Sequence, residues 1–135
     1  MSKVKGWRWI TSDVLYAVHD RQLAEHGGLT GVRDPGAVES AMSRARNLAA
    51  YGHKPDVAAL AAVYAYGLAR NHGFADGNKR TAWVMARLFL ADHGYRLRFE
   101  QIDAIHLMEE VAAGTLSEDQ LANWFRLRME IFHVR

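Results

Sequence analysis

The sequence has no cysteine, only two prolines in 135 residues, and no low-complexity stretch. Without cysteine, disulfide bonds, thiolate catalysis and cysteine-ligated metal sites are all excluded. With so few prolines and no internal repeat, no linker between domains can be placed. Hydrophobic residues make up 50% of the chain, which is enough for one sizeable core. We therefore expect a single domain over residues 1–135.

Long hydrophobic runs are also missing. The longest apolar stretches, Val57–Ala69 and Ala82–Ala91, are too short to cross a bilayer, and Arg87 interrupts the second. The first ten residues hold two lysines and an arginine but no continuous apolar stretch, so they lack the pattern of a signal peptide. We expect a cytoplasmic protein with no membrane partner.

A dense block of one charge is absent as well, although the sequence pI is about 9.1 and the formal net charge is +2. The basic residues are scattered along the chain, for example at Lys3, Arg21, Arg44, Arg70, Arg96 and Arg126. Nucleic-acid-binding surfaces more often carry a clustered basic stripe, so we expect no direct nucleic-acid partner. A helical nucleic-acid-binding regulator stays as an alternative that the pI alone supports.

Two common hydrolytic motifs are missing too. There is no His-Glu-x-x-His pair for zinc, and His19 and His26 share no metal-ligand spacing with other candidate ligands. No serine stands in a Gly-x-Ser-x-Gly turn. Zinc hydrolysis and serine-nucleophile chemistry are therefore not expected.

Helix signals dominate what is present. Thr11, Asp34 and Asp56 each precede an apolar periodic segment as N-cap residues, and residues 117–120 form a capping box. We expect helices from residue 12 to the glycines at 27–28, from 35 to about 46, from 57 to the turn at 72, from 78 to about 93, from 101 to 113, and from the capping box onward. The last helix is expected to carry an apolar stripe of Leu121, Trp124, Phe125, Met129 and Phe132.

The predicted fold is all-α, a compact bundle of about six helices around a buried central helix. The helix that begins at Asn78 is apolar on nearly every side, which suits this central place. Residues 7–10 and 95–99 alternate in polarity, and we expect them to pair as short β-strands.

The segment whose side chains are suited to binding and catalysis is His72-Gly-Phe-Ala-Asp-Gly-Asn-Lys-Arg80, a turn that runs into the start of this helix. Free N–H groups at a helix N-terminus form an anion site, and Gly77 lets the backbone approach a phosphate closely. Arg80 can bind phosphate oxygens with its forked guanidinium, and Lys79 adds a compact positive charge. The turn therefore predicts a polyphosphate site.

Two further side chains of the turn suit phosphoryl transfer. Asp76 is a hard oxygen ligand of the kind that binds magnesium shared with phosphates. Histidine side chains ordinarily change charge near neutral pH, so His72 is a candidate to accept a proton from an attacking hydroxyl. Taken singly, these residues have ordinary structural explanations, and Phe74 is expected to be a core anchor. Seven specified positions within nine residues favour a functional motif.

At these residues the sequence resembles the Fic superfamily, whose motif reads His-x-Phe-x-Asp/Glu-Gly-Asn-Gly-Arg-x-x-Arg. The stretch from His72 to Thr81 is more closely similar to the death-on-curing (Doc) branch of toxins, in which lysine replaces the second glycine, as at Lys79. The likeness extends over essentially the whole chain. A second segment resembles the substrate flap of that branch. Its residues are Gly28, Leu29, Thr30, Gly31, Val32 and Arg33.

The resemblance implies a function for each matching residue. His72 would be the base toward a target hydroxyl, and Asp76 the ligand of Mg²⁺. ATP would be held at its phosphates by Gly77, Asn78, Lys79 and Arg80. Arg70 matches an arginine of the branch that meets phosphate, and a surface charge closing the third helix is an equally good explanation for it.

Two positions depart from the superfamily pattern. Trp83 stands where the motif has its final arginine, so a second phosphate clamp is missing. Lys79 fills the place of the glycine that leaves the anion hole open in nucleotidylating members. The ammonium disfavours the AMP-transferring pose and permits the reversed one, with the γ-phosphate nearest the acceptor. The Doc branch, by resemblance, implies a kinase that phosphorylates a threonine of translation elongation factor Tu and blocks protein synthesis, with an adenylyltransferase as the alternative.

The superfamily also has an autoinhibitory signature, Ser/Thr-x-x-x-Glu-Gly/Asn, and this chain contains no copy of it. The resemblance therefore implies a toxin that is restrained by a separate antitoxin. Such a partner would have a disordered tail that folds on binding to an apolar groove.

Overall fold

The part of the chain that the structure describes forms six helices and one small two-stranded sheet. The structure is a computed structural model that describes residues 6–132. The elements, in order, are α1 (Ser12–His26), α2 (Pro35–Tyr51), α3 (Val57–Arg70), α4 (Asn78–Asp92), β1 (Tyr95–Leu97), α5 (Gln101–Ala113), α6 (Glu118–Arg128) and β2 (Met129–Ile131). The all-α prediction is confirmed, and α2 continues five residues beyond the predicted end near residue 46.

The predicted N-caps start the helices where the sequence placed them. Asp34 Oδ1 accepts from the backbone N–H of Ala37 at 3.1 Å, and Asp56 Oδ1 accepts from that of Ala59 at 2.9 Å. At α6, Ser117 and Gln120 bond reciprocally in the expected capping box. These side chains satisfy N–H groups that the first helical turn leaves without a partner.

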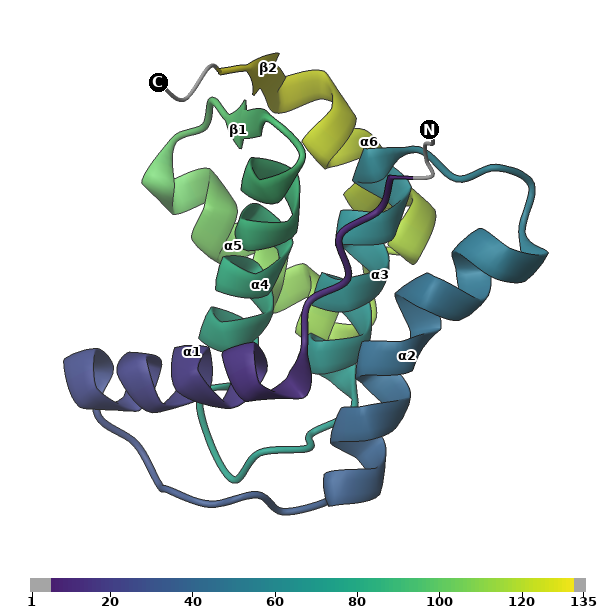
Figure 1. Ribbon diagram of the computed structural model, residues 1–135. Coiled ribbons are helices and arrows are strands. Elements are labelled where there is room, and N and C mark those ends of the chain that lie inside the picture. Colours follow the sequence, from purple (N-terminus) through teal and green to yellow (C-terminus); the bar gives the residue numbers. More distant parts are fainter. Residues whose placement is uncertain (1–5, 133–135) are drawn as a thin grey trace.

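The central helix is α3 and not α4 as predicted. Ten of the fourteen residues of α3 are buried, against six of fifteen in α4. α3 packs against α2, α4, α5 and α6, and it stands in the middle of the bundle (Figure 1). The alanines of α3 permit this close approach on several sides, while Lys79 and Arg87 leave α4 one exposed flank.

The sheet also differs from the prediction. β1 pairs antiparallel with β2, with Tyr95 opposite Ile131, and not with residues 7–10. The polar groups of that N-terminal segment go to side chains: Arg8 N donates to His93 Nε2 at 3.0 Å, and Ile10 N donates to the Tyr64 hydroxyl at 3.2 Å. Its alternating polarity therefore reflects tryptophan packing on α4, where Trp9 stacks with Phe89.

The end of the chain supplies the strand that pairs with β1. α6 stops at Arg128, so Met129 lies in β2 and Phe132 beyond it, and these two residues do not extend the apolar stripe of the helix. The other three residues of that stripe, Leu121, Trp124 and Phe125, lie on α6 and join the core or pack against it.

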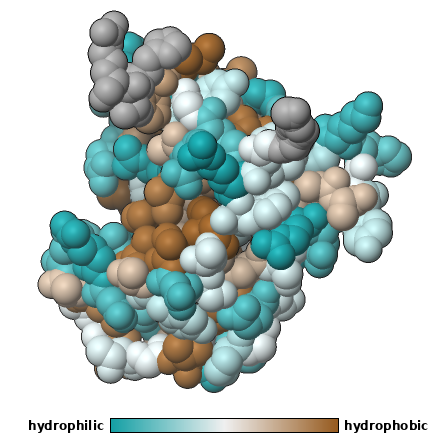
Figure 2. All heavy atoms as spheres, viewed as in Figure 1, coloured by the Kyte–Doolittle hydropathy of each residue, from teal (hydrophilic) through white to brown (hydrophobic). Residues whose placement is uncertain are grey.

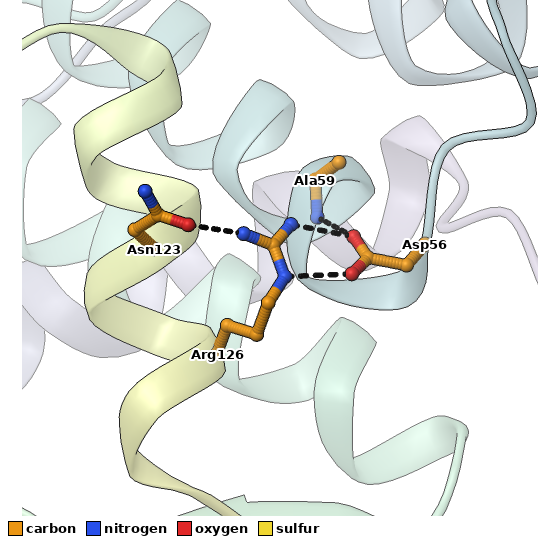
Figure 3. Close-up of polar contacts among 4 residues, drawn as sticks. All are labelled: Asp56, Ala59, Asn123 and Arg126. Atoms are coloured by element: carbon orange, nitrogen blue, oxygen red, sulfur yellow. Dashed lines mark hydrogen bonds and ion pairs between the residues drawn. The ribbon is translucent and has the colours of Figure 1, made fainter.

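An ion pair ties α6 to the start of α3 (Figure 3). Arg126 donates from Nε to Asp56 Oδ2 at 2.7 Å and from Nη2 to Oδ1 at 2.8 Å, and its third nitrogen donates to Asn123. The carboxylate of Asp56 thus caps α3 and binds α6 at once. The hydrogen bond from Arg126 is the main reason that the pKa of Asp56 lies below its ordinary value.

The overall arrangement leaves one end of the bundle to loops. α1 crosses beneath the lower end of α4, and the α1–α2 and α3–α4 connections run along that end together (Figure 1). The sheet lies at the opposite end of α4.

Hydrophobic residues gather near the middle of the face shown, above α1, and hydrophilic residues cover most of the rest (Figure 2). None of the helices within residues 6–132 is long and apolar enough to span a membrane.

Candidate active site

The α3–α4 connection, residues 71–77, is called here the motif loop, and residues 28–33 are called the flap. Backbone hydrogen bonds join the two. Gly73 O accepts from the N–H groups of Arg33 at 2.8 Å and Asp34 at 3.0 Å, and Ala75 N donates to Gly31 O at 3.1 Å. Val32 and Phe74 form an isolated antiparallel bridge. The structure thus brings together two segments that lie about forty residues apart in the sequence.

Phe74 anchors the motif loop in the core, as predicted. Its side chain is buried, and the Asn78 amide closes the loop by accepting from Phe74 N at 3.2 Å and donating to Phe74 O at 3.0 Å. Both ends of the Asn78 amide are therefore engaged with the backbone. This geometry favours a loop-holding function for Asn78 over direct phosphate binding by its side chain.

His72 lies at the start of the motif loop with an exposed side chain. Its φ of +51° places it in the left-handed region, which is uncommon for a residue with a side chain. The next residue, Gly73, packs so closely on α2 that an added Cβ would lie 2.4 Å from Val38 Cγ2. Strained backbone of this kind concentrates at functional sites, and here it sets where the imidazole leaves the loop.

Asp76 is held by backbone donors from both segments. Its Oδ2 accepts from Leu29 N at 3.1 Å and its Oδ1 accepts from Gly77 N at 2.8 Å. The hydrogen bond from Leu29, followed by that from Gly77, holds the pKa of Asp76 below its ordinary value. Gly28 must be a glycine, because an added Cβ would lie 2.8 Å from Asp76 Oδ2 at a φ of +128°.

The carboxylate of Asp76 suits a magnesium ion bound together with phosphates. It is ionised at neutral pH and only partly buried. Residues 6–132 contain no group of three or more acidic or histidine side chains that could hold a metal alone. Mg²⁺ commonly takes one or two protein carboxylates and completes its shell with water and substrate phosphates, so a single carboxylate fits.

The N-terminus of α4 is left open toward a ligand. Its N-cap, Gly77, has a φ of +76° and makes no side-chain capping bond, unlike the N-caps of α1, α2, α3 and α6. The guanidinium of Arg80 donates from Nη2 to Gly27 O at 3.2 Å, while its buried Nε has no partner in the part of the chain that the structure describes. Uncapped N–H groups and an unpaired cationic donor are what an anion needs.

A cavity of about 390 Å³ adjoins this helix start. Lys79, Arg80 and Trp83 line it from α4, and the remaining lining residues include Gln22, His26, Ile105 and Met108. Trp83 also packs edge-on against Phe99, with ring centroids 5.1 Å apart. The residue at the place of the motif's final arginine therefore forms an aromatic wall of the cavity.

Arg70 directly precedes the motif loop, and its side chain reaches the end of α5. Its Nη1 donates to the carbonyl of Val111 at 3.1 Å, near the end of α5, and its guanidinium lies over the ring of Tyr66 at 5.5 Å. Cations at a helix C-terminus stabilise the last carbonyls. The geometry favours a structural function for Arg70, and we leave it out of the proposed phosphate site.

Sequence reasoning missed His19, which lies on α1 against the motif loop. Its Nε2 is 2.8 Å from the carbonyl oxygen of Asp76, and its ring stacks on Phe74 with centroids 3.7 Å apart. The only signal in the sequence was its spacing of four residues from the buried Leu15, which puts both side chains on one helix face.

Comparison with known proteins agrees with the motif. The model of the Fic/DOC family matches residues 9–90. A protein from Escherichia phage P1 named "Protein kinase doc" is 35% identical over 119 residues, which cover 88% of this chain and 94% of that protein. A protein from Mycolicibacterium smegmatis named "Toxin Doc" is 40% identical over 100 residues, covering 71% of this chain and 76% of that protein. The family match includes both the flap and the motif loop.

Proposed function

We infer that this chain, which belongs to the Fic/DOC family, transfers the γ-phosphate of ATP to a threonine hydroxyl of translation elongation factor Tu and so blocks protein synthesis. The observation that carries this proposal is the start of α4, which has no side-chain cap and where the buried Nε of Arg80 has no partner within residues 6–132. Asp76 and Lys79 flank this helix start in the sequence. The similarity to a protein named as a kinase supports phosphoryl transfer in particular.

The site offers positioning and charge, which phosphoryl transfer mainly requires. The first N–H groups of α4 would donate to phosphate oxygens together with Arg80, and Gly77, which has no side chain, would let the phosphates approach closely. Asp76 would hold Mg²⁺, which neutralises charge on the phosphates when it is bound. The cavity lined by Trp83 and Met108 has the size and apolar character for the nucleoside.

The chemical step follows from this placement. The oxygen of the acceptor hydroxyl bonds to the γ-phosphorus while the bond from that phosphorus to the β–γ bridging oxygen breaks, and ADP leaves. The hydroxyl proton passes to the imidazole of His72, whose ring nitrogen can accept it as a general base. The His72 backbone conformation presents this imidazole from the loop that also carries Asp76.

Lys79 is the reason to prefer γ-phosphate over AMP transfer. It stands at the second position of α4, where the nucleotidylating pattern has glycine, and it lines the cavity beside Arg80. A flexible ammonium there occupies space that an open glycine leaves for the α- and β-phosphates. The pose that fits brings the γ-phosphate to the acceptor.

The flap suits a protein acceptor. Leu29 is 70% exposed and Val32 is 41% exposed, although both side chains are hydrophobic. The flap is also bonded to the motif loop through Gly31 and Arg33, so a polypeptide lying on it would bring a hydroxyl close to His72. Exposed apolar residues beside a site commonly mark a protein contact.

Labelled nucleotides test the proposal directly. Purified elongation factor Tu is incubated with the protein, Mg²⁺ and ATP labelled at either the α- or the γ-phosphate. Only the γ-label should remain on the factor, and His72→Ala should reduce the rate by about 10²–10⁴-fold. Retention of the α-label would instead establish the adenylyltransferase, and no label from either nucleotide would reject elongation factor Tu as the target.

Lys79→Gly adds a test of the orientation argument. We expect it to lower γ-phosphate transfer and to permit some α-label on the factor, while Lys79→Arg keeps a cation and favours the γ-label. If Lys79→Gly transferred γ-phosphate at the wild-type rate, the lysine would not determine the pose.

We also propose that a separate antitoxin restrains this protein. The support is the similarity to a protein named as a toxin and the absence of an autoinhibitory signature in the sequence. Co-expression with each neighbouring reading frame of the source genome tests this. The antitoxin should restore growth and co-purify with the chain, and rescue by none of the neighbours would contradict the proposal.

A further inference from the structure

We propose that His19 is a positioning residue that fixes the Asp76–Gly77 peptide in the orientation which the anion site needs. The inference rests on the proposed function, because it concerns the same site. The proposal adds a residue of α1, outside the motif, to the residues that prepare the site for anion binding.

The burial of His19 calls for a specific partner. The side chain is 3% exposed, and apart from Tyr64 it is one of two buried side chains with polar atoms within residues 6–132, the other being Thr81. Buried polar groups are nearly always hydrogen-bonded, since leaving one unpaired costs free energy. The partner of His19 is the Asp76 carbonyl at 2.8 Å. A carbonyl only accepts, so Nε2 of the ring carries the proton and donates it.

This bond determines which way the peptide between Asp76 and Gly77 faces. In a planar trans peptide the C=O and N–H groups point in opposite directions. With the carbonyl held at His19, the Gly77 N–H faces the Asp76 carboxylate, to which it donates at 2.8 Å. The same peptide therefore aims its donor, and not its oxygen, toward the side where the carboxylate lies.

Without His19, little in the backbone would keep this orientation. Gly77 has a φ of +76°, and glycine adopts either sign of φ at little cost. A flipped peptide would remove the Gly77 hydrogen bond from Asp76 and turn a carbonyl oxygen toward the place proposed for phosphate. An oxygen with partial negative charge in that place opposes anion binding.

The ring of His19 contacts the loop at further points. It stacks on Phe74 at 3.7 Å with an angle of 11° between the planes, and an added Cβ on Gly77 would lie 3.7 Å from it. Leu23, one turn further along α1, approaches within 3.4 Å of the same Cβ position. α1 therefore packs against Phe74, Asp76 and Gly77. Its polar contact with these three residues is the hydrogen bond from His19 to the Asp76 carbonyl.

Two substitutions separate the hydrogen bond from the packing. His19→Phe keeps an aromatic ring for the stack on Phe74 but removes the donor, while His19→Gln keeps a donor of similar reach but loses the ring. We expect His19→Phe to lower kcat or raise the half-saturating Mg²⁺ concentration by about 10–100-fold, as loss of such supporting bonds does elsewhere. His19→Gln should recover most of this loss. His19→Leu replaces His19→Phe if the latter does not fold.

His93 provides a matched control at the other end of α4. Its Nδ1 is 2.7 Å from Phe89 O, so it is also a histidine bonded to a backbone carbonyl. His93→Phe should change the melting temperature and leave kcat and the Mg²⁺ dependence as in the wild type. Wild-type kinetics in His19→Phe would overturn the proposal. So would equal losses of kcat in His19→Phe and His19→Gln that match the decreases in their melting temperatures.

Binding of MgATP, measured by calorimetry on the same variants, separates this inference from the proposed function. If the wild type transfers no phosphate to any acceptor, the proposed function fails while the calorimetry still judges His19. A weaker affinity in His19→Phe that is restored in His19→Gln supports the positioning role. Equal affinities in wild type and His19→Phe, or no binding even by the wild type, reject it.

Discussion

At the scale of single residues, the site depends on backbone positions as much as on charged side chains. The Asp76 carboxylate receives two backbone hydrogen bonds, from Leu29 and Gly77, and both donors lie next to glycine or are glycine. Small residues at these points let the flap and the motif loop approach each other. Substitution of a glycine is therefore expected to act on catalysis without removing any chemical group.

Gly28→Ala tests this dependence. The new Cβ would lie 2.8 Å from Asp76 Oδ2, so the carboxylate must move and its bond from Leu29 must lengthen. We expect a fall in kcat/KM of about 10–100-fold, the usual effect of disturbing a partner of a metal-binding side chain.

Gly94→Ala is the control for backbone strain alone. Gly94 also has a positive φ, of +88°, but an added Cβ there meets nothing within 4 Å. Both variants should lose some stability to the strained φ, and only Gly28→Ala should lose activity. Steady-state kinetics and thermal melts distinguish them. Equal activity losses in the two variants would show that the contact with Asp76 is unimportant.

At the scale of elements, the start of α3 depends on one carboxylate with two partners. Asp56 caps the helix through Ala59 N and binds Arg126 of α6 (Figure 3). We expect Asp56→Ala to cost about 1–2 kcal/mol of unfolding free energy, mostly from the lost cap, since the side chain is 51% exposed and such ion pairs are weak. Urea unfolding at neutral pH measures this loss.

The same carboxylate predicts a pH dependence. Its pKa is lower in the folded state than the ordinary value of 3.8, so its contribution is present at neutral pH and is lost as the pH falls through the folded pKa. The difference in stability between wild type and Asp56→Asn should therefore shrink in acid. Arg21→Ala, which breaks the exposed pair with Glu25, is the control and should have little effect at either pH. A difference that stays constant from neutral pH to pH 3 would contradict this assignment.

The elements also show what the sequence could predict. Helix starts were predictable because capping is local: Asp34, Asp56 and Ser117 each satisfy the N–H group three residues away. The pairing of β1 was not predictable, because Trp7 and Trp9 flank the polar Arg8 for a different reason, which is their packing on Phe89. Alternating polarity along a segment shows which side of that segment is buried. It does not show which other element covers that side.

At the scale of the whole molecule, the site joins segments from three places in the chain. The motif loop, the flap and His19 of α1 meet only in the folded protein. The motif was visible in the sequence because its residues are contiguous. The contacts of His19 with Asp76 and of Arg70 with the end of α5 depend on packing over long sequence distances, which no local pattern specifies.

Because the site needs the folded arrangement, binding of MgATP should stabilise the whole protein. A ligand at 100 times its dissociation constant adds about 2.7 kcal/mol to the unfolding free energy. We expect MgATP to raise the melting temperature more than ATP with EDTA does, and Asp76→Asn to lose that extra increase. An equal increase with and without Mg²⁺ in the wild type would show that Asp76 does not hold the ion together with ATP.

The central claim is tested most directly by the intact mass of purified elongation factor Tu after incubation with the protein, Mg²⁺ and ATP. We predict a mass increase of one phosphate group, which fragment masses place on a threonine and which is absent when His72→Ala replaces the wild type. An unmodified factor, or one carrying a whole adenylyl group, would contradict the proposed transfer.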